Sequence, residues 1–168
     1  MPYTRPVRYL RFTSTLIGLI LLAASTGGCL ASDNFAGSKH DQESLRKTGD
    51  AIRAAFAQGD IDAVMAYHHP DVIKALAPDR YLVGREAVRA DLIRTFSSFK
   101  LEFVDNRIES TFFHDGTAVQ ESLFTIRLTP LAGGAPSLFR GRSMVVYVRD
   151  RRSPTGWASI REIIQPMP

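Results

Sequence analysis

The sequence predicts an α+β domain in which three helices precede a long, strongly curved antiparallel sheet. Between residues 45 and 99, apolar side chains recur at the three- and four-residue spacing of amphipathic helices. From Lys100 onward the chain is rich in Val, Ile, Phe and Thr, in segments separated by turn sequences. A run of helices followed by a run of strands favours helices that fill the concave side of one sheet.

The first expected helix ends at Gly59, because glycine suits the left-handed backbone that often terminates a helix. Asp60 can then cap a second, short helix that ends around His68–Pro70. A short extended piece is expected at Val72–Leu76, and Gly84 opens the third helix. The apolar faces of the three helices are, in order, Leu45, Ile52, Ala55 and Phe56; Ile61, Val64 and Met65; and Val88, Leu92, Phe96 and Phe99.

Four strands are expected after the third helix, joined as an antiparallel meander. They cover residues 100–113, 117–129, 138–149 and 157–165. In the first of them, Leu101 and Phe103 alternate on one face, whereas Ile108 and Phe112 have the opposite parity. A bulge or bend between Val104 and Arg107 would reconcile the two halves and suits a curved sheet.

The 168 residues leave room for one domain. A net charge of +4 is a feature shared with nucleic-acid-binding proteins. However, three arginines lie in residues 1–28, a stretch without acidic residues. Without them, 18 basic residues face 17 acidic ones, so the rest of the chain is almost neutral. We therefore expect no nucleic-acid partner.

The N-terminus has the pattern of an export signal: arginines at positions 5–11, an apolar run over residues 15–25 and then small residues. Cys29 follows two glycines, an arrangement that resembles a bacterial lipobox, although Thr26 stands where lipoproteins usually carry Leu. We expect a signal peptide at 1–28, a lipid-bearing Cys29 with a flexible tether at 29–41, and the folded domain at 42–168. This predicts a lipid-anchored protein of the bacterial envelope; cleavage without lipid, or an uncleaved anchor, are the alternatives.

Three phrases of the sequence resemble the nuclear transport factor 2-like superfamily, specifically its SnoaL-like bacterial branch. They are 56-FAQGDIDAVMAYHHPDV-72, 83-VGREAVRADL-92 and 156-GWASIREI-163. The resemblance implies a cone-shaped α+β barrel with a pocket between the helices and the concave sheet. The family includes steroid isomerases, polyketide cyclases and dehydratases, as well as subunits that only assemble, so the fold alone does not give a function.

The adjacent His68 and His69 are not expected to bind a metal, because neighbouring side chains point in different directions. One of the two histidines is expected at the mouth of the pocket, and His69 is our candidate. The alternative is that the pair only forms the polar end of a helix. Tyr67 is a candidate donor in the pocket, although a core tyrosine is an equally good interpretation. No metal or other cofactor is expected.

Each of the last three expected strands carries charged residues on an otherwise apolar face: Glu121, then Arg140 and Arg142, then Glu162. If these faces are concave, Glu121, Arg142 and Glu162 meet in one cavity. A structural ion pair between neighbouring strands is the alternative. In the last strand the odd-numbered residues, among them Trp157 and Ser159, also form a partly apolar face, so they are an alternative to Glu162 and its neighbours as the concave side.

The leading hypothesis is an exported domain that binds a small apolar or amphipathic molecule, with cofactor-free proton transfer if it is an enzyme. Glu162 or Glu121 would then be the base, Tyr67 or His69 the proton donor, and Arg142, with Arg140 beside it, the anchor for a carbonyl or carboxylate. The alternative is a non-catalytic envelope lipoprotein that acts in protein interaction. In either case the sheet is expected to form a homodimer.

Overall fold

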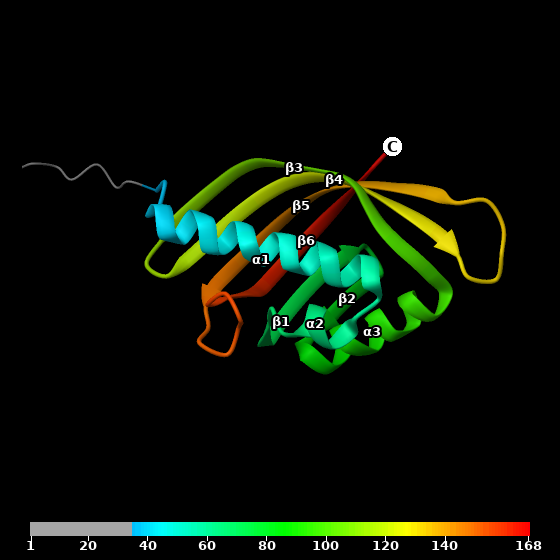
Figure 1. Ribbon diagram of the computed structural model, residues 1–168, viewed down its shortest axis with the longest axis horizontal. Helices are drawn as coiled ribbons and strands as arrows, with labels where there is room; N and C mark the ends of the chain where they lie inside the picture. Colours follow the sequence, from blue (N-terminus) through cyan, green and yellow to red (C-terminus); the bar gives the residue numbers. More distant parts are fainter. Residues whose placement is uncertain (1–34) are drawn as a thin grey trace, which may run out of the picture. The chain divides into compact units, whose positions relative to one another are not determined.

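The computed structural model describes residues 35–168. The expected signal peptide, Cys29 and the tether up to residue 34 lie outside the described residues. Within residues 35–168 three helices pack against one face of a six-stranded sheet (Figure 1). The predicted α+β class is therefore confirmed.

Helix α1 (Lys39–Gln58) begins at a capping box, in which Ser38 accepts a hydrogen bond from the Asp41 amide and Asp41 accepts one from the Ser38 amide. Residues 39–41 thus belong to the helix and not to the expected tether. The helix ends at Gly59, whose φ of 68° is the left-handed conformation that the sequence predicts there. Asp60 caps helix α2 (Ile61–Met65), as expected.

The segment after α2 differs from the prediction. The helix ends at Met65, and His68 already begins strand β1 (His68–Ala77), so the His pair lies in a strand and not at a helix end. Strand β2 (Arg80–Val83) was not predicted, and it leads directly into helix α3 (Gly84–Ser98). Local periodicity missed this because β1 is held by pairing with β2 and, far along the chain, with β6.

The four predicted C-terminal strands are present as β3 (Phe99–His114), β4 (Thr117–Pro130), β5 (Ser137–Arg149) and β6 (Trp157–Met167). The sheet order is β2-β1-β6-β5-β4-β3, and β1 runs parallel to β6 while every other pair is antiparallel. The meander thus places the last strand beside the first one.

The residues of strand β3 that face inward switch between odd and even positions twice. The register shifts between Phe103 and Asp105, where the sequence predicts a bulge, and shifts again between Ile108 and Ser110. The second shift was not predicted, and it turns Phe113 into the core while Phe112 stays exposed. Two bulges in one long strand add local bend and twist, which suits wrapping around the helices.

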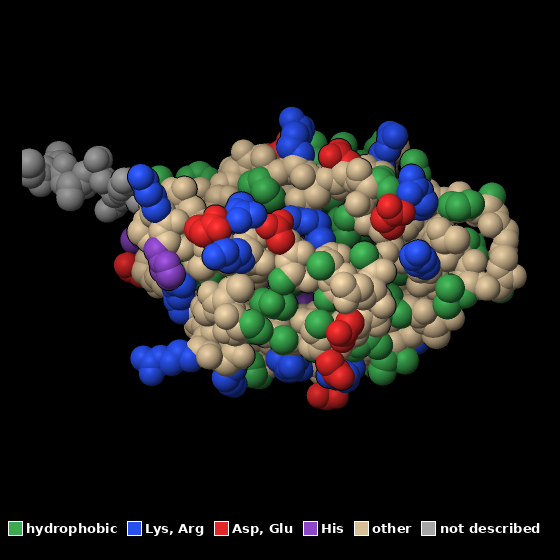
Figure 2. Space-filling model, in the orientation of Figure 1, with side chains coloured by type: hydrophobic (Ala, Val, Ile, Leu, Met, Phe, Trp, Pro, Cys, Tyr) green, Lys and Arg blue, Asp and Glu red, His purple; other side chains and the backbone are tan. Residues whose placement is uncertain are grey.

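The hydrophobic core consists of two clusters. One joins the helices to β1 through Ala55, Val64, Met65, Val72, Val88 and Leu92. The other joins the start of α1 to the strands through Leu45, Phe113, Ala118, Tyr147 and Trp157. The outer surface is mixed in charge, with basic and acidic side chains interspersed over the face in Figure 2.

Candidate functional site

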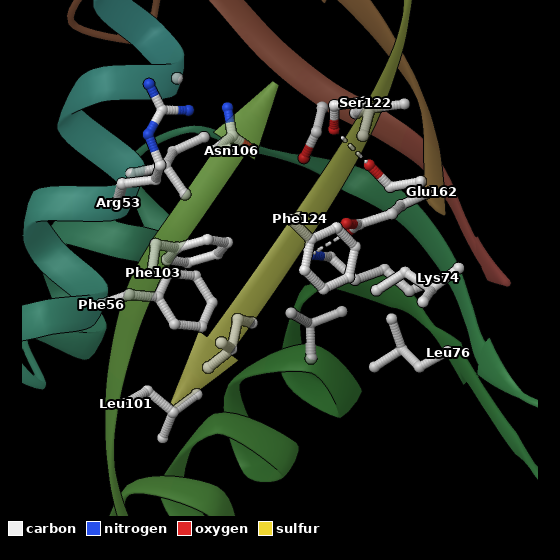
Figure 3. Close-up of a pocket in the computed structure, with 18 of the residues that line it drawn as sticks. Arg53, Phe56, Lys74, Leu76, Leu101, Phe103, Asn106, Ser122, Phe124 and Glu162 are labelled. Atoms are coloured by element: carbon white, nitrogen blue, oxygen red, sulfur yellow. Dashed lines mark hydrogen bonds and ion pairs between the residues drawn. The ribbon is translucent and has the colours of Figure 1, made fainter. Parts of the chain in front are cut away.

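A cavity of about 310 Å³, here called the main cavity, lies between helices α1 and α3 and the inner face of the sheet. Four phenylalanines from α1, β3, β4 and β5 form a chain of ring contacts along it, with centroid distances of 5.8, 6.1 and 5.9 Å: Phe56, Phe103, Phe124 and Phe139. Figure 3 shows Phe56, Phe103 and Phe124 close together in this cavity. The wall is therefore suited to a flat apolar or aromatic molecule.

Lys74 and Glu162 form an ion pair within this largely apolar wall. They are Cα partners on the parallel strands β1 and β6, and Nζ of Lys74 lies 2.5 Å from Oε2 of Glu162 (Figure 3). Their side chains are only 11% and 17% exposed, respectively. Glu162 was predicted from the sequence as a site residue, whereas its partner Lys74 was not.

Three further polar residues lie side by side on β1, β6 and β5, and we call His68, Ser159 and Tyr147 the polar row. Ser159 is the Cα partner of His68 on one side and of Tyr147 on the other. All three are buried and all three line the main cavity. The row lies beside the Lys74–Glu162 pair on the same sheet face.

His68 is an uncharged hydrogen-bond acceptor toward the cavity. Its Nδ1 lies 2.9 Å from the Val64 carbonyl, which can only accept, so Nδ1 carries the proton. Burial, and secondarily the nearby Lys74, holds the pKa of His68 well below its ordinary value of 6.5. The neutral ring therefore has an unprotonated Nε2, which has no hydrogen-bond partner within residues 35–168.

Tyr147 is an uncharged donor in the same row. Burial, and to a smaller extent the charge of Glu162, raises the pKa of the Tyr147 phenol, so the hydroxyl keeps its proton. Ser159 between the two is 3% exposed, and its Oγ is the one side-chain polar atom of the described chain that is itself fully enclosed and has no hydrogen-bond partner. Such an atom is uncommon in a folded protein and calls for an explanation.

Asp91 is a second buried carboxylate at the cavity, but its oxygens are already engaged. Arg80 donates to it with two nitrogens, and Arg94 donates at 3.0 Å. Arg80 also reaches the Thr95 hydroxyl, so this cluster joins β2 to α3. Two arginines on one carboxylate make Asp91 a structural anion and a poor proton acceptor.

The structure brings only one of the sequence-predicted protein site residues, Glu162, to the main cavity. On β4 the even-numbered residues line it, so Glu121 lies on the opposite face and accepts a hydrogen bond from Ser110 at 2.9 Å. On β5 the odd-numbered residues line it, which leaves Arg140 and Arg142 on the outer face. The expectation that Glu121, Arg142 and Glu162 share one cavity is therefore wrong. On β4 and β5 the residues that face the cavity are those next to Glu121 and Arg142, not these two residues themselves.

Tyr67 and His69 also lie outside the cavity lining. Tyr67 precedes β1, and its carbonyl accepts the Ser159 amide at 2.8 Å. His69 follows His68 on the strand and does not line the cavity. Its Nδ1 accepts a hydrogen bond from the Asp71 amide at 3.2 Å. The histidine that reaches the cavity is therefore His68, not His69.

Both parities proposed for the last strand are correct, each over part of its length. Ser159 pairs with Tyr147 of β5, and Arg161 pairs with the adjacent Val146. The extra residue of β6 between these two pairs forms a bulge. Ser159 therefore lines the cavity before the bulge, and Glu162 lines it afterwards. Without this bulge the polar row and the ion pair would lie on opposite faces.

Within residues 35–168 there is no group of three His, Cys, Asp or Glu side chains that could hold a metal ion. Separately, no helix in this part of the chain is long and apolar enough to cross a membrane.

The comparisons with known proteins agree with this fold. The model of the SnoaL-like domain family matches residues 50–152, and the chain belongs to this family. The search of curated proteins found no match to the sequence. Among solved structures, a conserved protein from Planctomyces limnophilus is similar, with a TM-score of 0.68 and 19% identity, covering 76% of this chain and 98% of that one.

Two further solved structures share the fold. A ketosteroid isomerase-like protein from Erwinia carotovora atroseptica has a TM-score of 0.66 at 16% identity, covering 78% of this chain and 99% of that one. A nuclear transport factor 2-like superfamily protein from Salmonella enterica has a TM-score of 0.64 at 13% identity, with 77% and 92% covered. At these identities the likeness establishes a nuclear transport factor 2-like fold and does not assign a reaction.

Proposed function

We propose that this SnoaL-like domain binds a small amphipathic molecule in the main cavity and catalyses a cofactor-free proton transfer on it. The observation that supports the proposal most is the position of Glu162, a carboxylate that faces an aromatic chamber beside Lys74. Charged side chains are rarely placed in such walls without a structural or chemical role.

Glu162 is the proposed base. Its Oε2 contacts Lys74, which leaves Oε1 to accept a proton from a substrate carbon or hydroxyl. Lys74 has three N–H donors and uses one on Glu162, so the others can stabilise the oxyanion that forms when the proton leaves. The pair therefore suits isomerisation, dehydration or cyclisation at a position next to a carbonyl group.

The relatives support the class of reaction in a general way. The SnoaL-like match covers residues 50–152, from the second half of α1 to just past the end of β5, and one similar structure is described as a ketosteroid isomerase-like protein. Both are consistent with an acid–base site in the cone and with an amphipathic substrate.

Binding is tested with 2-tetralone, a bicyclic ketone that resembles the proposed substrate class, in an NMR titration of the domain. The largest amide shifts are expected on the cavity strands, around Phe103, Ser122 and Glu162. Shifts confined to the turns at residues 131–136 and 150–156, which do not line the cavity, would contradict the proposal.

We also propose that the protein is exported and anchored through a lipid on Cys29, which is supported by the arginines, the apolar run and the glycines that precede this residue. The test compares the natural chain with its Cys29→Ala variant by fatty-acid labelling and membrane fractionation. Label and membrane association are expected only with Cys29; unchanged behaviour of the variant would exclude lipidation.

A second candidate function is dimerisation through the outer face of the sheet. Met144 and Ile163 are cross-strand partners there, and they are 42% and 58% exposed. Exposed apolar neighbours of this kind favour a protein contact, and a second copy of the chain is the proposed partner. Analytical ultracentrifugation should show a dimer that the Met144→Lys variant weakens, and a monomer at all concentrations would exclude this function.

A further inference from the structure

We infer that the polar row selects ligands with one uncharged hydrogen-bonding group, a hydroxyl or a carbonyl, attached to an apolar body. This inference rests on the proposed binding in the main cavity and specifies its ligand class. Three observations support it: an unpaired buried hydroxyl, complementary groups on both sides of it, and the pairing of every charge in the cavity wall.

The unpaired hydroxyl belongs to Ser159. Its Oγ is buried and has no hydrogen-bond partner. The buried hydroxyls of Ser122 on β4 and Ser143 on β5, in contrast, pair with each other at 2.9 Å. A buried hydroxyl without a partner costs stability, so it is readily explained as a group whose partner comes from a ligand. The side chain of a serine has three staggered positions, so Oγ can turn toward a molecule in the cavity.

The neighbours of Ser159 provide one acceptor and one donor. His68 offers the unprotonated Nε2, and Tyr147 offers a protonated hydroxyl that has no hydrogen-bond partner within residues 35–168. The row is fixed in place because the His68 ring is bound to the Val64 carbonyl and Tyr147 belongs to the second core cluster. A ligand hydroxyl can both donate and accept here, and a ligand carbonyl can accept from Ser159 and Tyr147.

The charges in the wall indicate that this group is neutral. Five charged residues line the main cavity, and each has an ionic partner: Arg53 with Asp50, Lys74 with Glu162, and Arg80 with Asp91. No cation of the cavity wall is thus left unpaired to offset a ligand carboxylate. Moving an uncompensated anion into this buried site would be costly, whereas a neutral group needs only the hydrogen bonds of the row.

The test uses three probes of the same bicyclic shape: naphthalene, 2-naphthol and 2-naphthoate. Affinities for the purified domain are measured by probe fluorescence at neutral pH. We expect 2-naphthol to bind about tenfold more tightly than naphthalene, as one well-made buried hydrogen bond predicts. We expect 2-naphthoate to bind more weakly than 2-naphthol.

Two variants locate the effect at the row. Ser159→Ala and Tyr147→Phe each remove one hydroxyl with almost no change of shape, and each should reduce the preference for 2-naphthol over naphthalene to about twofold. The Ser97→Ala variant, on the surface of α3, should keep the full preference. Circular dichroism checks that each variant is folded.

The outcomes separate this inference from the proposed function. If both naphthalene and 2-naphthol bind with equal affinity to the natural domain, the inference is wrong and cavity binding stands. If 2-naphthoate binds best, the ligand class is anionic and the inference is also wrong. If none of the probes binds, the main cavity is not a binding site, and both claims are overturned.

Discussion

Lys74 on the first strand and Glu162 on the last strand form an ion pair of 2.5 Å across the one parallel ladder of the described sheet. Residues almost ninety positions apart therefore meet only when β6 docks beside β1. The same ladder aligns His68 with Ser159, so both the ion pair and the polar row depend on it.

The first prediction concerns the stability of this pair. The Glu162→Gln variant leaves the Lys74 ammonium partly buried without its counter-charge, and the free energy of unfolding should fall by about 2 kcal/mol. The double variant Lys74→Met with Glu162→Met removes both charges and should regain most of this loss. Urea denaturation measures all three proteins, and a double variant as unstable as the single one would show that the pair is not the cause.

The second prediction concerns pH and distinguishes the two adjacent histidines. The pKa of His68 is lowered in the folded protein, so below its ordinary value of 6.5 the unfolded chain binds a proton that the folded chain does not. Stability should therefore decrease as the pH falls from about 6.5, by up to about 1.4 kcal/mol per pH unit.

The matched control is its neighbour on the strand. The His68→Gln variant should lose this component of the pH dependence between pH 6.5 and 5, whereas His69→Gln should retain it. Unfolding curves in urea at several pH values provide the comparison. An identical pH dependence in both variants would refute the assignment of the buried neutral histidine.

The third prediction follows from the unpaired hydroxyl. Ser159→Ala should raise the free energy of unfolding by about 1 kcal/mol, because it removes a buried polar group that has no partner. Ser143→Ala should lower it by about the same amount, because it leaves the Ser122 hydroxyl unpaired. Equal destabilisation by both substitutions would mean that Ser159 has a partner in the folded protein.

The fourth prediction concerns the aromatic wall. Gly141 lies opposite Phe124 on the neighbouring strand, and a Cβ at this position would lie 2.8 Å from the Phe124 ring. Gly141→Ala should push the ring into the main cavity and weaken the binding of 2-naphthol several-fold. Calorimetric titration measures the change, and an unaltered affinity would show that the ring does not border the ligand.

Much of the fold could be predicted from the sequence because its signals are local. Gly59 and Asp60 mark helix ends through backbone conformation and capping, and the parity change after Phe103 indicates the first bulge. Strand β2 was missed because its four residues, of which three are exposed, show no alternation. The second bulge of β3 was missed because Phe112 and Phe113 are both aromatic, so the sequence does not show which one faces inward.

The site was harder to predict because it depends on which face of each strand is concave. Glu121 and Arg142 have apolar neighbours on the outer face too, so hydrophobicity alone placed them on the wrong side. The sequence does carry one signal for Lys74: it stands between Val72 and Leu76 in a strand-like alternation, which indicates an inward-facing lysine. Its pairing with Glu162 could not be foreseen, since it requires the parallel contact of β1 with β6.

The measurement that tests the central claim most directly is proton exchange at the α-carbon of 2-tetralone in D₂O, followed by NMR. Glu162 should remove the proton and Lys74 should stabilise the resulting enolate, so the natural domain should exchange deuterium into the ketone well above the buffer rate. Glu162→Gln should fall to the buffer rate, while Glu102→Gln, which changes an exposed carboxylate on β3, should keep the natural rate. Exchange at the buffer rate with the natural domain, or full exchange with Glu162→Gln, would contradict the account.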